Sequence, residues 1–324
     1  MNTTRKLPVG IQDFEYLRTS NFLYVDKTEY LYRLVTQGKP YFLSRPRRFG
    51  KSLFLSTLKA YFEGKRELFE GLKIAGLEKD WTKYPVIYLD FNVGLLTGAA
   101  NVAERLSVKM QAFELLWEKK IDTVDLASRF EAIIESAYEQ TGEKVVVLID
   151  EYDKPLINTM EDEVSNAGIR TLLKSFYGVL KSADRHLRFV FLTGVTKFSK
   201  VSIFSDLNQL VDISLDENFA GICGITQAEL EGNFAPEIAA LAETTRKTRE
   251  ETLFELQKRY NGYHFSENLI SVYNPFSLLN TFAAQNTVTT GLPPARRRFW
   301  QNTLRIQDLT FQYLKIMFPL QPTP

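Results

Sequence analysis

The sequence contains almost no cysteine or histidine, and this scarcity excludes two common kinds of site. Cys223 is the single cysteine, and only two histidines stand among the 324 residues. One cysteine cannot form an internal disulfide, and so few thiol and imidazole groups cannot assemble the usual zinc ligand sets. We therefore expect a protein of the reducing cytoplasm without a zinc site.

The sequence also lacks a surplus of either charge and any long apolar run. Its 40 Lys and Arg residues nearly balance its 39 Asp and Glu residues, which gives a net charge of +1. Dedicated nucleic-acid-binding proteins are usually strongly basic, so the charge does not support a nucleic-acid partner. The N-terminus has no apolar signal-peptide core, and no later segment reaches about 18 successive apolar residues. We expect no membrane association.

Short apolar runs alternate with longer segments of helical periodicity. The apolar runs, which we expect to be strands, are residues 41–44, 86–91, 145–150 and 189–193, with 210–213 as a further candidate. Helical periodicity occurs between them at residues 52–62 and 102–119. This alternation is typical of βαβ units, in which helices cover parallel strands. The sequence therefore predicts an α/β fold with a parallel sheet flanked by helices.

The pattern changes near residue 216, where charged helical segments begin. A helix start is expected at residues 226–230 and a charged helical stretch at 236–260. Residues 285–324 continue neither pattern and contain five of the twelve prolines. We predict three segments, which are an α/β domain at 1–215, a small and mostly helical domain at 216–284, and a tail at 285–324. A winged-helix-like arrangement is one candidate for the helical domain.

The most informative motif stands between the first strand and the first helix of the α/β pattern. It reads Arg45, Pro46, Arg47, Arg48, Phe49, Gly50, Lys51, Ser52. A phosphate-binding loop needs inward backbone N–H groups, a lysine for the β- and γ-phosphates, a hydroxyl for Mg²⁺ and a helix N-terminus. Gly50, Lys51 and Ser52 supply such parts at this junction. The usual motif has glycine where Arg45 stands, so the loop must turn differently. A basic turn without a ligand is the alternative.

Two acidic residues follow the most apolar strand. Residues 145–149 form a continuous apolar run, as in a central parallel strand, and Asp150 and Glu151 follow directly. Ligands of open α/β sheets bind beyond the carboxyl ends of the strands, which makes Asp150 a candidate Mg²⁺ ligand and Glu151 a candidate activator of water. Thr193 ends another strand and is a candidate sensor of the γ-phosphate or the attacking water. The alternative is an acidic turn without a catalytic part.

Together these motifs resemble the bacterial AAA-ATPase-like family of P-loop ATPases, which are often followed by a nuclease-like domain of the PD-(D/E)XK superfamily. The blocks that carry the resemblance are residues 7–14, 24–28, 42–52, 148–154, 198–204, 260–265 and 273–277. The opening of the loop, with Arg45 in place of glycine, is itself usual in this family. The resemblance therefore implies a P-loop NTPase fold and ATP hydrolysis with Mg²⁺.

The resemblance also assigns roles to individual residues. The implied ATP-binding residues are Arg47, Arg48, Phe49, Gly50, Lys51, Ser52 and, near the adenine, Gly10. Ser52 and Asp150 would bind the metal ion. Lys51, Glu151 and Thr193 would take part in catalysis. No arginine finger is identifiable in the sequence, and a neighbouring subunit could supply one, which makes a homo-oligomer a candidate assembly.

Other activities fit the sequence less well. Neither histidine stands near the nucleophile-elbow motif of a Ser-His-acid hydrolase. The nuclease-like domain of the resembled family would lie beyond the present C-terminus. The main alternative to an ATPase is a switch that binds ATP, turns over little and uses nucleotide occupancy to control a partner or a fused nuclease-like domain.

The tail has the features of an out-of-frame translation. The resembled family continues at this point with a segment like Tyr-Trp-Phe-x-Thr-Gly-Thr-Pro-Thr-Phe-Leu. Suppose that each codon is rebuilt from the third base of one residue and the first two bases of the next. With suitable synonymous codons, residues 290–300 then spell Tyr-Trp-Phe-Ala-Thr-Gly-Thr-Pro-Thr-Phe-Leu.

We therefore interpret residues 285–324 as the disordered product of a frameshift, with a genuine divergent extension as the alternative. The coding DNA decides between them. The tail has five Lys or Arg residues and one acidic residue, so the rest of the chain has a net charge of −3. That charge further weakens the case for a nucleic-acid partner.

Overall fold

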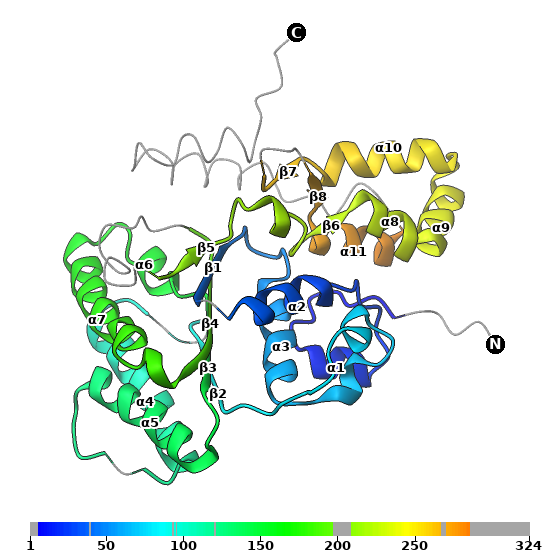
Figure 1. The fold of residues 1–324 in the computed structure, drawn as a ribbon. Helices are drawn as coiled ribbons and strands as arrows, with labels where there is room; N and C mark the ends of the chain where they lie inside the picture. Colours follow the sequence, from blue (N-terminus) through cyan, green and yellow to red (C-terminus); the bar gives the residue numbers. More distant parts are fainter. Residues whose placement is uncertain are drawn as a thin grey trace. The chain divides into compact units, whose positions relative to one another are not determined.

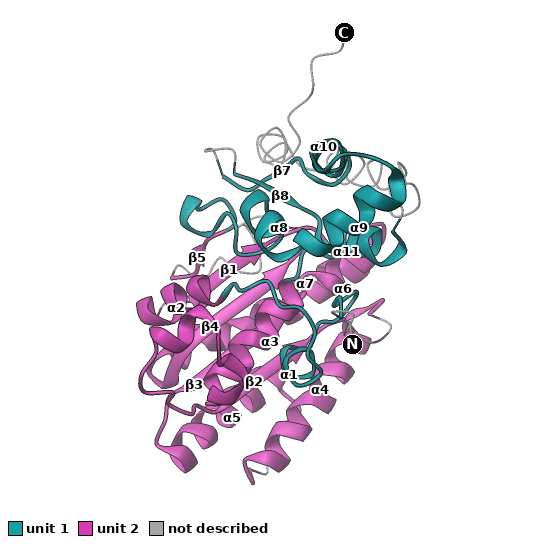
Figure 2. Ribbon diagram, turned by 90° about the vertical axis from the view of Figure 1, so that its right-hand side faces the viewer, with its two compact units in different colours: residues 1–27, 47–50, 214–324 teal, residues 28–46, 51–213 magenta. Residues whose placement is uncertain are grey.

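A computed structural model describes residues 6–38, 40–92, 94, 96–119, 121–196, 209–266 and 270–285. The chain divides into two compact units, coloured separately in Figure 2. Unit 1 comprises Met1–Lys27, Arg47–Gly50 and Ser214–Pro324, and unit 2 comprises Thr28–Pro46 and Lys51–Ile213. The block 198–204 and the tail after Gln285 lie outside the described residues. The domain boundaries expected near residues 215 and 284 stay predictions.

Unit 2 is built on a five-stranded sheet with the strand order β2-β3-β4-β1-β5 (Figure 1). The strands are β1 Pro40–Ser44, β2 Val86–Asp90, β3 Val145–Asp150, β4 Leu187–Gly194 and β5 Val211–Asp212. Strand β1 pairs with β4 and β5, and β3 pairs with β2 and β4, all in parallel. Each of these strands overlaps a predicted one. The predicted α/β fold with a parallel sheet flanked by helices is confirmed.

Helices cover both faces of this sheet. They are α2 Thr28–Gln37, α3 Lys51–Phe62, α4 Ala99–Leu116, α5 Leu126–Thr141, α6 Lys154–Asn158 and α7 Glu163–Ser182, with the 3-10 turns η1 Arg66–Phe69, η2 Lys73–Gly76 and η3 Asp184–His186. Figure 1 shows α4, α5 and α7 on one face and α2 and α3 on the other. Every residue of β3 is buried, as expected for a strand covered on both faces. Within the described residues, no helix is both long and apolar enough to cross a membrane.

Aromatic packing fixes helix α3 on the sheet. Phe54 and Phe62 of α3 pack against Phe191 and Phe189 of β4, with ring centroids 5.8 and 5.1 Å apart. All four rings are buried. Because burial of an aromatic side chain contributes about 1.5–3 kcal/mol, this contact holds the helix firmly. The N-terminus of α3 is thereby held next to the carboxyl end of β1.

Unit 1 combines helices with a small antiparallel sheet of order β6-β8-β7. Its elements are α1 Phe14–Thr19, η4 Glu217–Phe219, β6 Ile225–Thr226, α8 Gln227–Asn233, α9 Ala235–Thr245, α10 Arg249–Tyr260, β7 Tyr263–His264, β8 Ser271–Tyr273 and α11 Pro275–Ala284. The charged stretch expected at 236–260 is two helices. Arg246 ends α9 in the left-handed region with φ 54°, and Thr248 caps α10 through a capping box with Glu251.

A buried lysine joins the N-terminal segment of unit 1 to its C-terminal segment. The Lys27 ammonium donates hydrogen bonds to the Gly221 carbonyl at 2.7 Å and to both Glu229 carboxylate oxygens at 2.6 and 2.7 Å. Burial lowers the pKa of Lys27, and the Glu229 charge opposes that shift. The pair therefore ties together two parts of the chain that are far apart in sequence.

Candidate functional site

The predicted phosphate loop joins β1, which ends at Ser44, to α3, which begins at Lys51. Two loop residues have a positive φ, Arg48 at 69° and Gly50 at 95°. Only glycine adopts such angles readily, which explains Gly50. Arg45 has no positive φ, and its backbone N–H donates to the Gly194 carbonyl of β4 at 3.2 Å. The loop turns after the position where the usual motif has glycine, so arginine is tolerated there.

Lys51 lies inside the curve of this loop. Its side chain is 4% exposed, and its ammonium donates to the backbone carbonyls of Arg45 at 2.9 Å and Pro46 at 3.2 Å. Lys51 is also the first residue of α3, whose N-terminus carries a partial positive charge. An ammonium and a helix N-terminus at one place form a site suited to an anion such as phosphate.

Asp150 lies at the carboxyl end of β3 and is 1% exposed. Its Oδ1 accepts a hydrogen bond of 2.5 Å from the Thr193 hydroxyl, and the Ser52 side chain is also hydrogen-bonded to it. Burial raises the pKa of Asp150, while these hydrogen bonds and the positive charge of Lys51 oppose the shift. Unit 2 therefore brings together four predicted site residues, Lys51, Ser52, Asp150 and Thr193.

Glu151 follows in a strained backbone conformation. It has φ 50°, in the left-handed region that glutamate rarely adopts, and it is 8% exposed. Its backbone N–H donates to the Thr193 hydroxyl at 3.4 Å, and its carboxylate lies 3.5 Å from the Lys154 ammonium. Strained residues held by their surroundings cluster at functional sites. The strain therefore agrees with Glu151 as a candidate site residue.

The structure adds Asp153, which sequence reasoning missed. This carboxylate is fully buried, and its Oδ2 accepts from the backbone N–H groups of Val195 and Thr196 at 2.9 and 2.7 Å and from the Thr196 hydroxyl at 2.8 Å. Among the described residues, its Oδ1 has no hydrogen-bond partner. Burial raises the pKa of Asp153, while bonds from Thr196 and the charge of Lys51 oppose the shift. The available signal was one more carboxylate shortly after a buried strand.

The other predicted site residues belong to unit 1. Phe49 is 1% exposed and packs edge-to-face on Tyr263 and Phe265, with centroids 4.7 and 5.6 Å away, so only its backbone is free to reach a phosphate. Arg47, Arg48 and Gly50 are exposed. Gly10 is exposed in a turn of the N-terminal segment, and its place near the adenine stays a prediction.

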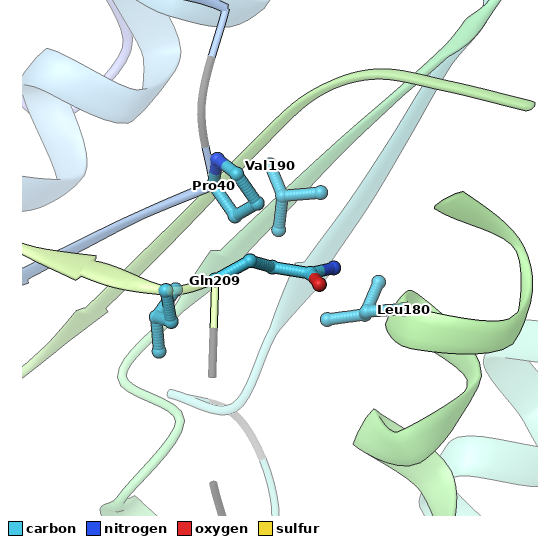
Figure 3. A pocket seen from close by; sticks show the side chains of 5 residues that line it. Pro40, Leu180, Val190 and Gln209 are labelled. Carbon is cyan, nitrogen blue, oxygen red and sulfur yellow. The ribbon is translucent and has the colours of Figure 1, made fainter. Parts of the chain in front are cut away.

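A small cavity in unit 2 lies away from these residues (Figure 3). It is lined by Pro40, Leu180, Val190, Gln209 and Leu210, and its volume is about 10 Å³. Pro40 begins β1, whereas the phosphate loop follows the other end of that strand. A cavity of about 10 Å³ holds one water molecule at most, and ligand pockets are typically about 300–1,000 Å³. This cavity is not a nucleotide site.

The residues at the carboxyl ends of the strands suit a hard divalent cation. Ser52 offers a hydroxyl oxygen and Asp150 a carboxylate oxygen, and the two side chains already touch. Mg²⁺ prefers oxygen ligands and is usually held in proteins by one or two carboxylates together with substrate phosphates. The donor set therefore fits Mg²⁺ that arrives with a nucleotide.

Comparison with known proteins points in the same direction. A family model described as "Predicted AAA-ATPase" matches residues 8–204. A curated protein of Azotobacter chroococcum mcd 1, described as an uncharacterized protein in the vnfD 5' region, is 41% identical over 284 residues, which cover 86% of this chain and 52% of the relative. The chain thus spans about half the length of that relative. No solved structure matches the chain.

Proposed function

Because the chain belongs to the predicted AAA-ATPase family, we propose that it binds ATP at the loop of residues 45–52 and hydrolyses it with Mg²⁺. The observation that carries the proposal is the contact of Asp150 with both Ser52 and Thr193, beside the buried Lys51. A turn with a purely structural role does not require a hydroxyl, two carboxylates and an ammonium in one buried site. Phosphoryl transfer needs such groups.

In this proposal the loop binds the phosphates of ATP. The Lys51 ammonium exchanges its bonds to the Arg45 and Pro46 carbonyls for bonds to phosphate oxygens. The backbone N–H groups of Arg47, Arg48, Phe49 and Gly50 complete the phosphate site, and Gly10 lies near the adenine. Positioning and charge neutralisation of this kind supply most of the catalysis in phosphoryl transfer.

The carboxylates act on the metal ion and the water. When bound, Mg²⁺ neutralises charge that develops on the phosphate oxygens. Ser52 and Asp150 would hold this ion, and Thr193 fixes the orientation of the Asp150 carboxylate through its 2.5 Å hydrogen bond. Glu151 orients the attacking water and accepts its proton. The Lys154 ammonium, 3.5 Å from the Glu151 carboxylate, helps to hold that side chain in place.

A nucleotide-dependent switch with little turnover is the second candidate. The ion pair of Glu151 with Lys154 favours it, because a carboxylate oxygen in contact with an ammonium is less available to contact a water molecule. For this candidate, nucleotide occupancy would control a partner or a fused nuclease-like domain. A homo-oligomer, in which a neighbouring subunit supplies an arginine, would convert such a switch into an active ATPase.

Steady-state phosphate release separates the two candidates. We expect Mg²⁺-dependent release from the wild-type chain, loss of release in Lys51→Ala, and at least about a 100-fold fall in kcat in Glu151→Gln with ATP binding retained. Nucleic acid is added in a parallel series to test it as an activator. If the chain binds ATP but both variants leave an already negligible turnover unchanged, the enzyme proposal is wrong and the switch stands.

A further inference from the structure

The middle of the phosphate loop has a backbone conformation that its residue type does not favour. Arg48 has φ 69°, in the left-handed region where the Cβ of an L-residue crowds the neighbouring backbone. The only glycine of the loop, Gly50, stands two positions later and cannot relieve this crowding. The turn at Arg48 must therefore be stabilised by contacts outside the loop itself.

Residues 47–50 belong to unit 1, and its C-terminal segment supplies those contacts. The Arg48 guanidinium lies over the ring of Phe276 in α11, 3.8 Å from the ring centroid. The next residue, Phe49, is buried edge-to-face against Tyr263 at 4.7 Å and Phe265 at 5.6 Å. Both residues of the turn are thus held by aromatic side chains from a distant part of the sequence.

A backbone hydrogen bond adds to this packing. The Phe49 carbonyl accepts from the Gly224 N–H at 3.1 Å. Gly224 has φ 90°, and a Cβ there would come within 2.8 Å of Val272 Cγ2. Only glycine lets this segment lie so close to β8 and still direct its N–H at the loop. The turn is therefore held by the side-chain contacts of Arg48 and Phe49 and by the hydrogen bond to the Phe49 carbonyl.

We propose that Phe276, Tyr263 and Phe265 are positioning residues for ATP, which hold Arg48 and Phe49 in the phosphate-binding conformation. They support at Arg48 a positive φ that glycine would adopt without support. The proposal rests on the proposed function, because it concerns the affinity of the same loop. A loop that adopts the binding conformation only part of the time has an apparent affinity reduced by that fraction. Loss of an aromatic contact should therefore weaken ATP binding without changing the catalytic groups.

The test measures the Kd of ATP with Mg²⁺ for the full chain by calorimetry. Phe276→Leu removes the cation–π contact and should raise Kd about two- to fivefold. Tyr263→Leu removes an edge-to-face pair and should raise Kd about two- to tenfold. The matched control is Phe282→Leu, which lies on the same helix α11, is buried, and stacks on Phe234 at 5.4 Å instead of on the loop. Thermal unfolding of each variant corrects for general loss of stability.

A rescue experiment addresses the mechanism. In the Phe276→Leu background, Arg48→Gly should restore affinity, because glycine adopts a positive φ without support from the ring. Phe276→Tyr keeps an aromatic face under the guanidinium and should bind ATP as the wild type does. Purely structural damage from loss of Phe276 would not be repaired by a change at Arg48.

The outcomes are distinguishable. If wild-type chain binds ATP and Phe276→Leu and Tyr263→Leu bind it as tightly as Phe282→Leu, the positioning role is wrong and the proposed function stands. If Arg48→Gly leaves the Phe276→Leu defect unchanged, the ring does not act on the turn and the proposal is also wrong. If wild-type chain binds no ATP, the proposed function itself fails.

Discussion

The carboxylates after β3 and the phosphate loop after β1 are held in place by different kinds of contact. Asp150 and Asp153 receive hydrogen bonds from Thr193, Val195 and Thr196 at the end of the neighbouring strand β4. The turn of the loop at Arg48 and Phe49 rests instead on aromatic rings of unit 1. One region is fixed by the sheet and the other by side chains distant in sequence.

This difference has a functional consequence. The carboxylates after β3 keep their geometry as long as the sheet is folded. Under the proposed function, substitutions around them should therefore change the rate of ATP turnover. The turn at residues 47–50 is part of unit 1 and depends on the stability of that unit, so under the proposed function its effect is on ATP affinity. We therefore expect substitutions at the strand ends to lower kcat and substitutions around the loop turn to weaken ATP affinity.

The largest effect is expected from a substitution that destabilises unit 1 and leaves the five-stranded sheet of unit 2 unchanged. Lys27→Met leaves the partly buried Glu229 carboxylate, whose side chain is 22% exposed, without its ammonium, and removal of one partner from a buried pair costs at most about 3–5 kcal/mol. Amide hydrogens of residues 225–266 and 270–284 should exchange up to about 100-fold faster, while the strands of unit 2 keep their protection. Hydrogen exchange followed by mass spectrometry measures both units at once.

Arg33→Met is the matched control for this change. Arg33 also pairs with a glutamate, Glu29, but the two side chains are 46% and 41% exposed. Such surface pairs contribute about 0–1 kcal/mol, so exchange should change little. Equally faster exchange in both variants, or faster exchange spread evenly over both units, would contradict the view that the Lys27–Glu229 pair stabilises unit 1 specifically.

A smaller effect is expected at the sheet. Thr193→Val removes the hydroxyl that orients Asp150, and a hydrogen bond to a charged group contributes about 1.5–3 kcal/mol. We expect kcat for ATP hydrolysis to fall at least about tenfold with KM nearly unchanged, and Thr193→Ser to retain most of the activity. A rise in KM with kcat intact would mean that Thr193 supports binding, and the separation of the two regions would be lost.

The smallest effect concerns pH. Burial raises the pKa of Asp153 above its ordinary value of 3.8, so the folded chain binds a proton that the unfolded chain has already lost. The stabilising contribution of this group is therefore largest below pH 3.8 and is lost as pH rises toward the folded pKa. Asn cannot ionise, so Asp153→Asn should gain stability relative to wild type as pH rises through this window. Urea unfolding at several pH values measures the difference, and parallel profiles would contradict it.

Much of the sheet and half of the site could be predicted because their signals are local. The apolar run before Asp150 marks a central strand, and polar residues at the ends of parallel strands meet at one edge, which brought Asp150 and Thr193 together. The strand–helix junction likewise indicated Lys51 and Ser52. Each of these inferences needs only the residues of one element and the rule that strands run in parallel.

The rest could not be predicted, because it depends on contacts between distant residues. No sequence periodicity predicts that Arg48 contacts Phe276 or that Lys27 pairs with Glu229. The break in the helical stretch at Arg246 was missed because arginine rarely adopts a left-handed conformation. Asp153 carries a local signal, but its role is visible only in its bonds to the end of β4.

The most direct test of the central claim is equilibrium binding of ATP to the wild-type chain and to Lys51→Ala in the presence of Mg²⁺. Loss of a charged partner from a buried phosphate contact costs about 2–5 kcal/mol, so the variant should bind at least about 30-fold more weakly. Saturable binding by wild-type chain that is lost in Lys51→Ala is the predicted result. Equal affinity of the two proteins would show that ATP does not bind at this loop.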